Sequence, residues 1–146
     1  MKKNLIVTLM GPTGVGKTDL IIELYSQIPI TIISVDSIQI YKHLNIGSGK
    51  PSNEVLKKYP HELIDFVEPT ESYSTARFQE DVIHCIKDSF EANKTPVLVG
   101  GTMMYFHHLI NGISKLPSVS NQIRIAVQSE FDEKGSEEMH LSLIHI

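Results

Sequence analysis

The sequence predicts an α/β fold in which helices flank a parallel sheet. Continuous apolar runs bounded by turn residues alternate with stretches of helical period along the chain. The run ITIISV at residues 30–35 is β-branched and apolar, which is typical of a strand covered on both faces. This alternation implies right-handed crossovers between parallel strands. With 146 residues, the chain is long enough for one domain with a core and too short for two ordinary ones.

The first elements surround a glycine-rich segment. The apolar run at residues 4–10 is expected to form a buried strand. Apolar residues recur at i, i+4 spacing over residues 18–28, which predicts an amphipathic helix. Pro29 ends that helix, and residues 30–35 form the next strand.

The later elements continue the alternation of strand and helix. We expect a short helix at 52–59, a weaker strand at 61–67, a helix at 74–93, a strand at 95–101, and two helices at 102–112 and 120–131. The last two helices begin at Thr102 and Ser120, whose hydroxyls are expected to cap them.

A complete phosphate-binding motif lies between the first strand and the first helix. The stretch GPTGVGKT fits G-x-x-x-x-G-K-[ST] at Gly11, Gly16, Lys17 and Thr18. Such a loop turns backbone N–H groups toward an anion, and the following helix adds its positive N-terminal end. Lys17 would neutralise terminal phosphate oxygens, and the Thr18 hydroxyl would help to hold Mg²⁺. The motif predicts a P-loop NTPase-like fold of three layers and a di- or triphosphate ligand.

The motif alone leaves the substrate open among a kinase, a nucleotide-driven switch and a transferase that uses another diphosphate. A switch GTPase would normally carry an N-K-x-D element, which the sequence lacks. The strand at 95–101 ends in two glycines instead of a metal-organising Asp. Asp36 is then the only acid of that kind at the end of a predicted strand.

Asp36 is expected to face the same cleft as the phosphate loop, because ligands of open α/β sheets bind at the carboxyl ends of the strands. It would position Mg²⁺ or accept a proton, and the alternative is an Asp that only caps a turn. Ser37 and Gln39 are candidates for hydrogen bonds to a substrate edge. Lys50, in the glycine-flanked stretch NIGSGKP, is either an exposed turn residue or a second cation near the diphosphate. The double glycine before Thr102 predicts a close backbone approach at the same cleft.

Composition excludes several classes of function. The formal net charge of −4 lacks the basic excess of a domain that grips a nucleic-acid backbone, so a nucleic-acid role must rest on local contacts. No apolar run approaches the ~20 residues that span a bilayer. The single cysteine, Cys85, is interpreted as a core or boundary residue in a reducing cytoplasm. His107 and His108 lie in a helical pattern without metal-ligand partners and are interpreted as structural or surface residues.

The chain resembles the bacterial tRNA dimethylallyltransferase (tRNA isopentenyltransferase) family from about residue 4 to residue 140. The resemblance rests on several long blocks in the same order and spacing: GPTGVGKT, VDSIQIYKHLNIGSGKP, PHELIDFVEPTESYSTARF, VLVGGTMMYFHHLINGIS and LPSVSNQIR. It implies a prenyltransferase that moves a dimethylallyl group from dimethylallyl diphosphate to an exocyclic adenine amine. The adenine lies beside the anticodon of tRNAs that read codons beginning with U, and the products are isopentenyladenosine and diphosphate.

The resemblance also implies roles for individual residues. The loop residues Gly11, Pro12, Thr13, Gly14, Val15, Gly16, Lys17 and Thr18 would bind the diphosphate of the prenyl donor. Three residues are implied to be catalytic: Asp36 as proton acceptor, Thr102 beside the reaction centre, and Lys17 on the leaving group. Residues implied to contact tRNA are Asp36, Ser37, Ile38, Gln39, Thr102 and Arg124. Thr18 would be the metal ligand, with Mg²⁺ as the cofactor. The partners are the tRNA anticodon stem-loop and dimethylallyl diphosphate, and the protein is expected to be a cytoplasmic monomer.

The chain departs from the family in length, since family members continue for well over a hundred residues beyond the point where this sequence stops. We expect residues 1–140 to be the N-terminal part of the catalytic core, and the tRNA-gripping helical insertion and later helices to be absent. Residues 141–146, LSLIHI, are interpreted as a non-native tail, because they resemble a translated sequencing adaptor; the alternative is a genuine strand. The rival functions are a P-loop small-molecule kinase, an adenylate isopentenyltransferase acting on free nucleotide, and an inactive diphosphate-binding fragment.

Overall fold

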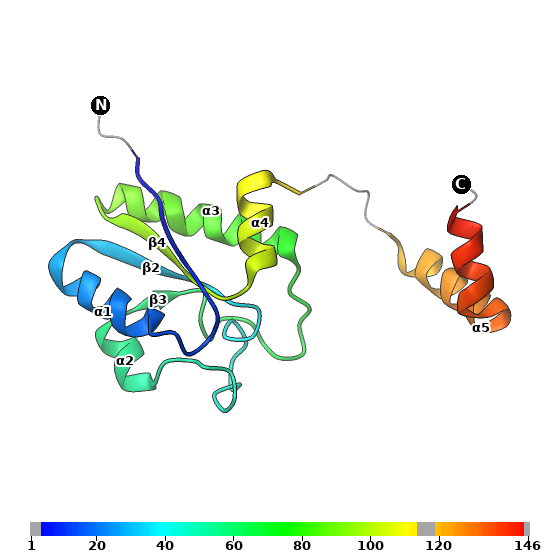
Figure 1. Ribbon diagram of the computed structural model, residues 1–146, viewed down its shortest axis with the longest axis horizontal. Coiled ribbons are helices and arrows are strands. Elements are labelled where there is room, and N and C mark those ends of the chain that lie inside the picture. Colours follow the sequence, from blue (N-terminus) through cyan, green and yellow to red (C-terminus); the bar gives the residue numbers. More distant parts are fainter. Residues whose placement is uncertain (1–3, 114–118, 145–146) are drawn as a thin grey trace. The chain divides into compact units, whose positions relative to one another are not determined.

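The computed structural model describes residues 4–113 and 119–144, and the chain divides into two compact units, 1–113 and 114–146. The first unit holds all the strands of the described chain (Figure 1). In the described residues, no helix combines the length and the apolar character needed to cross a membrane.

A four-stranded parallel sheet forms the middle of the first unit, as the alternation of elements predicts. Its strands are β1 (Val7–Met10), β2 (Ile30–Val35), β3 (His61–Glu62) and β4 (Thr95–Gly100), and their order across the sheet is β1-β4-β2-β3. All three pairings are parallel. Because β4 lies between β1 and β2, the last residues of β1 and β2, Met10 and Val35, both pair with Gly100, the last residue of β4.

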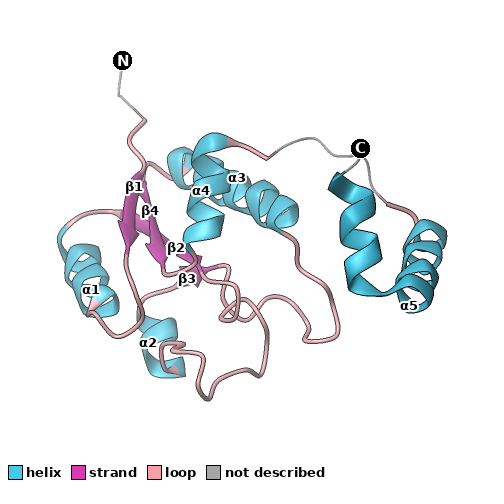
Figure 2. Cartoon of the chain, turned by 45° about the vertical axis from the view of Figure 1, so that its right-hand side comes forward, coloured by secondary structure: helices cyan, strands magenta, loops and turns pink. Residues whose placement is uncertain are grey.

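Helices cover both faces of this sheet (Figure 2). They are α1 (Lys17–Gln27), α2 (Asn53–Lys58), α3 (Thr75–Glu91) and α4 (Met103–Asn111). Helices α1 and α2 lie on one side of the sheet, and α3 and α4 lie on the other (Figure 1). The layers are thus helix, sheet and helix, and the prediction of a three-layer α/β fold is confirmed.

The side chains of β2 explain why the strand carries apolar residues on both faces. Ile30 and Ile32 pack with Ile21 of α1 in one buried cluster. Ile33 and Val35 point to the opposite face and join a second cluster with residues of α3 and α4. Successive side chains of a strand alternate between faces, so a strand between two helical layers carries apolar residues on both faces.

The second cluster also contains a stacked aromatic pair. The rings of Phe78 and Tyr105 lie 4.1 Å apart between centroids, and both side chains are buried. Cys85 packs partly buried against this cluster, and burial raises the pKa of its thiol to about 11. The interpretation of Cys85 as a boundary residue is confirmed.

Two strand predictions were wrong in extent or burial. The predicted buried strand at 4–10 is ordered as a strand only over Val7–Met10, and Met10 is 45% exposed. The cause is its place in the sheet, since in the described chain β1 pairs with β4 alone. The candidate strand at 61–67 is reduced to the two residues of β3, with one isolated bridge between Tyr41 and Val67.

The described part of the second unit forms one helix, α5 (Asn121–Ile144), which contains a break at Gly135, where φ is 78° and ψ is 172°. Ser120 caps the helix as predicted, because its Oγ accepts a hydrogen bond from the N–H of Ile123 at 3.4 Å. Residues 141–144 continue the helix, so the alternative of a strand at this place is wrong.

Candidate diphosphate site and catalytic carboxylate

The phosphate loop runs from β1 into α1 and is shaped by two glycines. Gly14 and Gly16 both have φ of +85°, in the left-handed region that residues with a Cβ rarely adopt. Gly16 stands immediately before the first turn of α1. The loop therefore lies at the N-terminal end of an eleven-residue helix. The N–H groups of such a loop and the positive end of such a helix together favour binding of an anion.

Lys17 folds its side chain back along the phosphate loop. Its ammonium donates hydrogen bonds to the carbonyl oxygens of Gly11 at 2.8 Å and Pro12 at 2.7 Å. An ammonium has three N–H donors, so these two contacts leave one for a ligand. The Gly11 N–H in turn donates to the carbonyl of Gly100 at 3.3 Å, which fixes the start of the loop against the end of β4.

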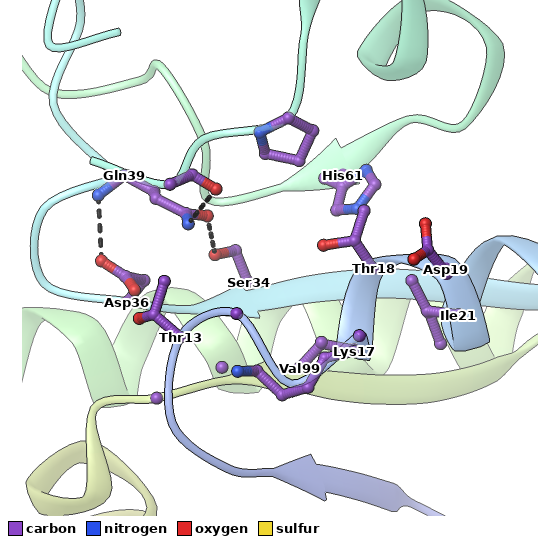
Figure 3. Close-up of a pocket in the computed structure, with 16 residues that line it drawn as sticks. Thr13, Lys17, Thr18, Asp19, Ile21, Ser34, Asp36, Gln39, His61 and Val99 are labelled. Carbon is purple, nitrogen blue, oxygen red and sulfur yellow. Dashed lines mark hydrogen bonds between the residues drawn. The ribbon is translucent and has the colours of Figure 1, made fainter. Parts of the chain in front are cut away.

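A cavity of about 360 Å³ lies beside this loop and extends to the end of β2 (Figure 3). The loop contributes Thr13, Gly14, Gly16, Lys17 and Thr18 to its lining. The rest of the lining comes from Asp19, Ile21, Ser34, Asp36, Gln39, Gly49, Pro51, His61, Val99, Gly100 and Gly101. The prediction that the phosphate loop and Asp36 face one cleft is confirmed. Gly11, Pro12 and Val15, also predicted to bind diphosphate, do not line this cavity.

Asp36 follows the last residue of β2 and uses one carboxylate oxygen to hold the next turn. Its Oδ1 accepts hydrogen bonds from the N–H groups of Ile38 at 2.9 Å and Gln39 at 3.1 Å. Asp36 therefore does cap a turn, as the alternative interpretation of this residue predicted. Because Asp36 also lines the cavity, its second oxygen remains for a substrate proton or for a metal-bound water.

Thr102 sits at the start of α4, but its hydroxyl makes no capping bond to that helix. Its Oγ1 instead accepts a hydrogen bond from the N–H of Ser37 at 3.1 Å. The predicted side-chain cap at Thr102 was therefore wrong, because a partner 65 residues away in the chain occupies the hydroxyl. The contact joins the start of α4 to the residue next to Asp36.

Gln39 lines the cavity with an amide that is already engaged. Its Nε2 donates to the carbonyls of Ser48 at 3.4 Å and Gly49 at 3.1 Å. Its Oε1 accepts from the Ser34 hydroxyl at 3.5 Å (Figure 3). The Ile38 side chain is 49% exposed. Contacts of Ser37, Ile38 and Gln39 with a nucleic acid stay predictions.

Both roles predicted for Lys50 were wrong. Its side chain is 2% exposed and does not line the cavity, so it is neither an exposed turn residue nor a cation beside the diphosphate. Its ammonium is bonded to Asp65, Asn45 and the carbonyl of Tyr41. The sequence pattern could not reveal these partners, because a lysine flanked by glycines is as common on a surface turn as in a site.

His61 lines the cavity and was not singled out from the sequence. Its Nδ1 lies 2.6 Å from the carbonyl oxygen of Tyr59. Since a carbonyl only accepts, Nδ1 carries the proton and Nε2 of the neutral ring is an acceptor. Figure 3 shows His61 with Thr18 and Asp19 toward one end of the cavity and Asp36 and Gln39 toward the other. The sequence signals were a polar residue at the head of a weak strand and its place in the block PHELIDFVEPTESYSTARF, and neither distinguishes a site residue from an edge residue.

We predict that His61 makes the stability of the fold depend on pH. Burial lowers the pKa of His61 from its ordinary value near 6.5, and the bond to the Tyr59 carbonyl opposes this only in part. Below about pH 6.5 the unfolded chain therefore binds a proton that the folded chain does not, and the free energy of unfolding falls until the lower folded pKa is passed. Denaturant unfolding at pH 7.5 and 5.5 should show a smaller pH dependence in His61→Asn than in the wild type. The exposed His84→Asn is the control, and equal pH dependence in all three proteins would contradict the assignment.

The cavity suits a magnesium ion that is held partly by the protein and partly by the phosphates of a bound substrate. In the described residues, no group of three or more His, Cys, Asp or Glu side chains could form a metal site alone. Mg²⁺ prefers oxygen ligands and usually combines one or two protein oxygens with substrate phosphates and waters. The Thr18 hydroxyl lines the cavity together with the phosphate loop, so one protein oxygen beside bound phosphates fits that pattern.

Arg124 lies on α5 in the second compact unit and is exposed. Its predicted contact with tRNA stays a prediction.

The model of the family described as IPP transferase matches residues 39–146. The chain belongs to this family. It is 45% identical over 139 residues to a tRNA dimethylallyltransferase of Dichelobacter nodosus, covering 95% of this chain and 44% of the relative. It is 44% identical over 137 residues to a tRNA dimethylallyltransferase of Psychrobacter, covering 94% of this chain and 38% of the relative.

A solved structure shares the fold. The full-length tRNA isopentenylpyrophosphate transferase of Bacillus halodurans superposes with a TM-score of 0.73 at 32% identity, covering 97% of this chain and 47% of that one. The P-loop NTPase-like fold predicted from the phosphate motif is thereby confirmed, as is the resemblance to the transferase family. The chain spans less than half of the length of these relatives.

Proposed function

We propose that this protein transfers a dimethylallyl group from dimethylallyl diphosphate to the exocyclic amine of the adenine beside the anticodon, in tRNAs that read codons beginning with U. The observation that carries the proposal is that a phosphate loop and the Asp36 carboxylate line one cavity. A group that receives a leaving diphosphate and a group that receives a proton thus face the same space. The names of the relatives support the choice of prenyl donor and tRNA acceptor.

The reaction replaces a carbon–oxygen bond with a carbon–nitrogen bond and moves one proton. The amine nitrogen attacks the allylic carbon, the carbon–oxygen bond to the diphosphate breaks, and the diphosphate leaves with the electron pair. The amine proton passes to the free oxygen of Asp36. Because an exocyclic adenine amine is a poor nucleophile, stabilisation of the leaving group and positioning must supply most of the rate.

The phosphate loop stabilises the leaving group in this proposal. The N–H groups at the start of α1 face the diphosphate oxygens, and Lys17 brings a third N–H donor and a full positive charge. When bound at Thr18, Mg²⁺ would supply further neutralisation of the charge that develops on the diphosphate.

The acceptor base enters on the Asp36 side of the cavity in this proposal. A base splayed out of a single-stranded anticodon loop is read on its edges, which fits a site lined by Ser34 and Asp36. We propose further tRNA contacts from Ser37, Ile38, Gln39, Thr102 and Arg124. The net charge of −4 agrees with recognition by local contacts. We also propose that the protein works in the cytoplasm as a monomer.

The experiment is transfer of label from radiolabelled dimethylallyl diphosphate. Unmodified tRNA and free AMP are offered separately, and a third reaction contains ATP with a small-molecule hydroxyl acceptor. The assays use the 146-residue chain and, in parallel, the same chain continued by the C-terminal part of the Dichelobacter nodosus relative. Label on tRNA supports the proposal. Label on AMP alone would make the substrate a free nucleotide, and ATP-dependent phosphorylation without prenyl transfer would replace it with a kinase.

We predict that Lys17→Ala weakens binding of dimethylallyl diphosphate by about 10- to 100-fold. The variant loses a charge-assisted hydrogen bond to the ligand, typically about 1.5–3 kcal/mol. It also loses the bonds to the Gly11 and Pro12 carbonyls that shape the loop. Calorimetric titration with the magnesium salt of the donor measures the effect. Lys87→Ala, on the exposed side of α3, is the control, and an unchanged affinity of Lys17→Ala would argue against the loop as the donor site.

A further inference from the structure

Lys50 carries an ammonium group that is almost fully withdrawn from solvent. Its side chain is 2% exposed, and its Nζ donates to the Tyr41 carbonyl at 2.9 Å, to Asn45 Oδ1 at 3.1 Å and to Asp65 Oδ1 at 2.5 Å. The three N–H donors of the ammonium are thus all used within the protein. A cation buried in this way depends on its partners, because desolvation is costly unless each donor is satisfied.

These three partners close a loop and anchor it. Tyr41 and Asn45 lie before the turn that leads to Lys50. The bonds of Lys50 to these two residues therefore join the two ends of that turn. Asp65 lies beyond β3, and its own N–H donates to the carbonyl of Gln39 at 3.1 Å. We call residues 45–51 the glycine loop. Lys50 joins the glycine loop to the segment that follows β3.

The glycine loop forms part of the wall of the cavity. Gly49 and Pro51 line it. The carbonyls of Ser48 and Gly49 accept the hydrogen bonds of the Gln39 amide. A Cβ at Gly49 would lie only 3.2 Å from Cγ2 of Thr13, so the glycine loop approaches the phosphate loop directly. The position of the glycine loop therefore affects both the phosphate loop and Gln39.

We propose that Lys50 is a positioning residue for the ligand cavity. Its buried ammonium holds the glycine loop against Thr13 and Gln39, and this sets the wall that faces the phosphate loop. Lys50 touches no ligand in this role. The identity of the ligand as a prenyl diphosphate rests on the proposed function, whereas the positioning does not.

An exposed ion pair provides a matched control. Lys42 and Glu68 lie 2.6 Å apart and join the same two stretches of chain, since the Lys42 N–H also donates to the Val67 carbonyl. Their side chains are 38% and 48% exposed, so solvent already satisfies both charges in part. Lys42→Met therefore removes an exposed ion pair near the glycine loop and leaves the three bonds of the buried Lys50 ammonium in place.

The test compares Lys50→Met and Lys42→Met with the wild-type 146-residue chain at a temperature where all are folded. Backbone amide NMR spectra are recorded without ligand. Dimethylallyl diphosphate, ATP and inorganic diphosphate, each with Mg²⁺, are then titrated calorimetrically. We expect Lys50→Met to shift the amide signals of Thr13, Gln39 and Gly49, with little change in α3. It should bind whichever ligand the wild type prefers at least 10-fold more weakly. Lys42→Met should change that affinity less than twofold.

Unchanged Thr13 and Gln39 signals together with wild-type affinity in Lys50→Met would overturn the proposal. If Lys50→Met does not fold, Asp65→Asn replaces it, because the amide keeps an oxygen acceptor while removing the charge. Asp65→Asn should give the same signal shifts and a smaller loss of affinity, and wild-type behaviour would equally overturn the proposal. A wild type that prefers ATP would end the prenyl-donor assignment, while the signal shifts would still decide the role of Lys50.

Discussion

Asp36→Asn is expected to lower the rate of prenyl transfer to tRNA by about 10²- to 10⁴-fold, with little change in donor affinity. Asparagine keeps an Oδ1 that accepts hydrogen bonds from the N–H groups of Ile38 and Gln39, so the turn after β2 is retained. The variant loses only the carboxylate oxygen that would take the amine proton. Because the variant keeps the turn and loses only the proton acceptor, a lower transfer rate reports on proton acceptance and not on folding.

Single-turnover transfer of labelled donor measures the effect, in the chain continued by the C-terminal part of the Dichelobacter nodosus relative. Asp88→Asn, exposed on α3, is the matched control and should transfer at the wild-type rate. Asp36→Asn with full turnover would rule out the general-base role and leave Asp36 as a turn residue.

Gly100→Ala is expected to reduce the free energy of unfolding by at least about 3 kcal/mol, which is a large part of the stability of a small domain. A Cβ at Gly100 would lie 1.9 Å from the carbonyl oxygen of Val35 and 2.5 Å from its carbonyl carbon. Both are backbone atoms of β2, which is paired with β4 at this position. The clash cannot be relieved by a side-chain rotation, so the strands must separate.

Gly101→Ala is the control for this change. A Cβ there would meet only the Gly11 carbonyl oxygen, at 3.3 Å, which small shifts of the phosphate loop can accommodate. Denaturant unfolding should place Gly101→Ala within about 1 kcal/mol of the wild type. A Gly100→Ala protein of similar stability would show that the two strands do not approach this closely.

The central elements of the fold follow from local pattern, and the edges do not. β2 is apolar on both faces because helices cover both, and its bounds match the predicted 30–35. The buried strand predicted at 4–10 fails because the burial of a strand depends on its neighbours in the sheet. The short β3 has the same origin, since pairing with β2 extends over two residues only.

The site shows the same division between motif and tertiary contact. The phosphate loop and Asp36 could be placed together because both follow parallel strands, whose carboxyl ends share one edge. The cap at Thr102 and the two roles of Lys50 were predicted wrongly, because their partners, Ser37 and Asp65, are brought to them by the fold. His61 carries no motif, and only its position beside β2 brings it into the cavity.

The central claim is that the phosphate loop binds the diphosphate leaving group of a prenyl donor and does not serve the hydrolysis of a nucleoside triphosphate. The most direct measurement is the amount of diphosphate released for each prenyl group transferred to tRNA, in a reaction that contains Mg²⁺ and no nucleotide triphosphate. We predict equal amounts of the two products, and inhibition when ATP is added, because ATP would compete for the same loop. Transfer that requires ATP hydrolysis, or diphosphate release without transfer to tRNA, would contradict the account.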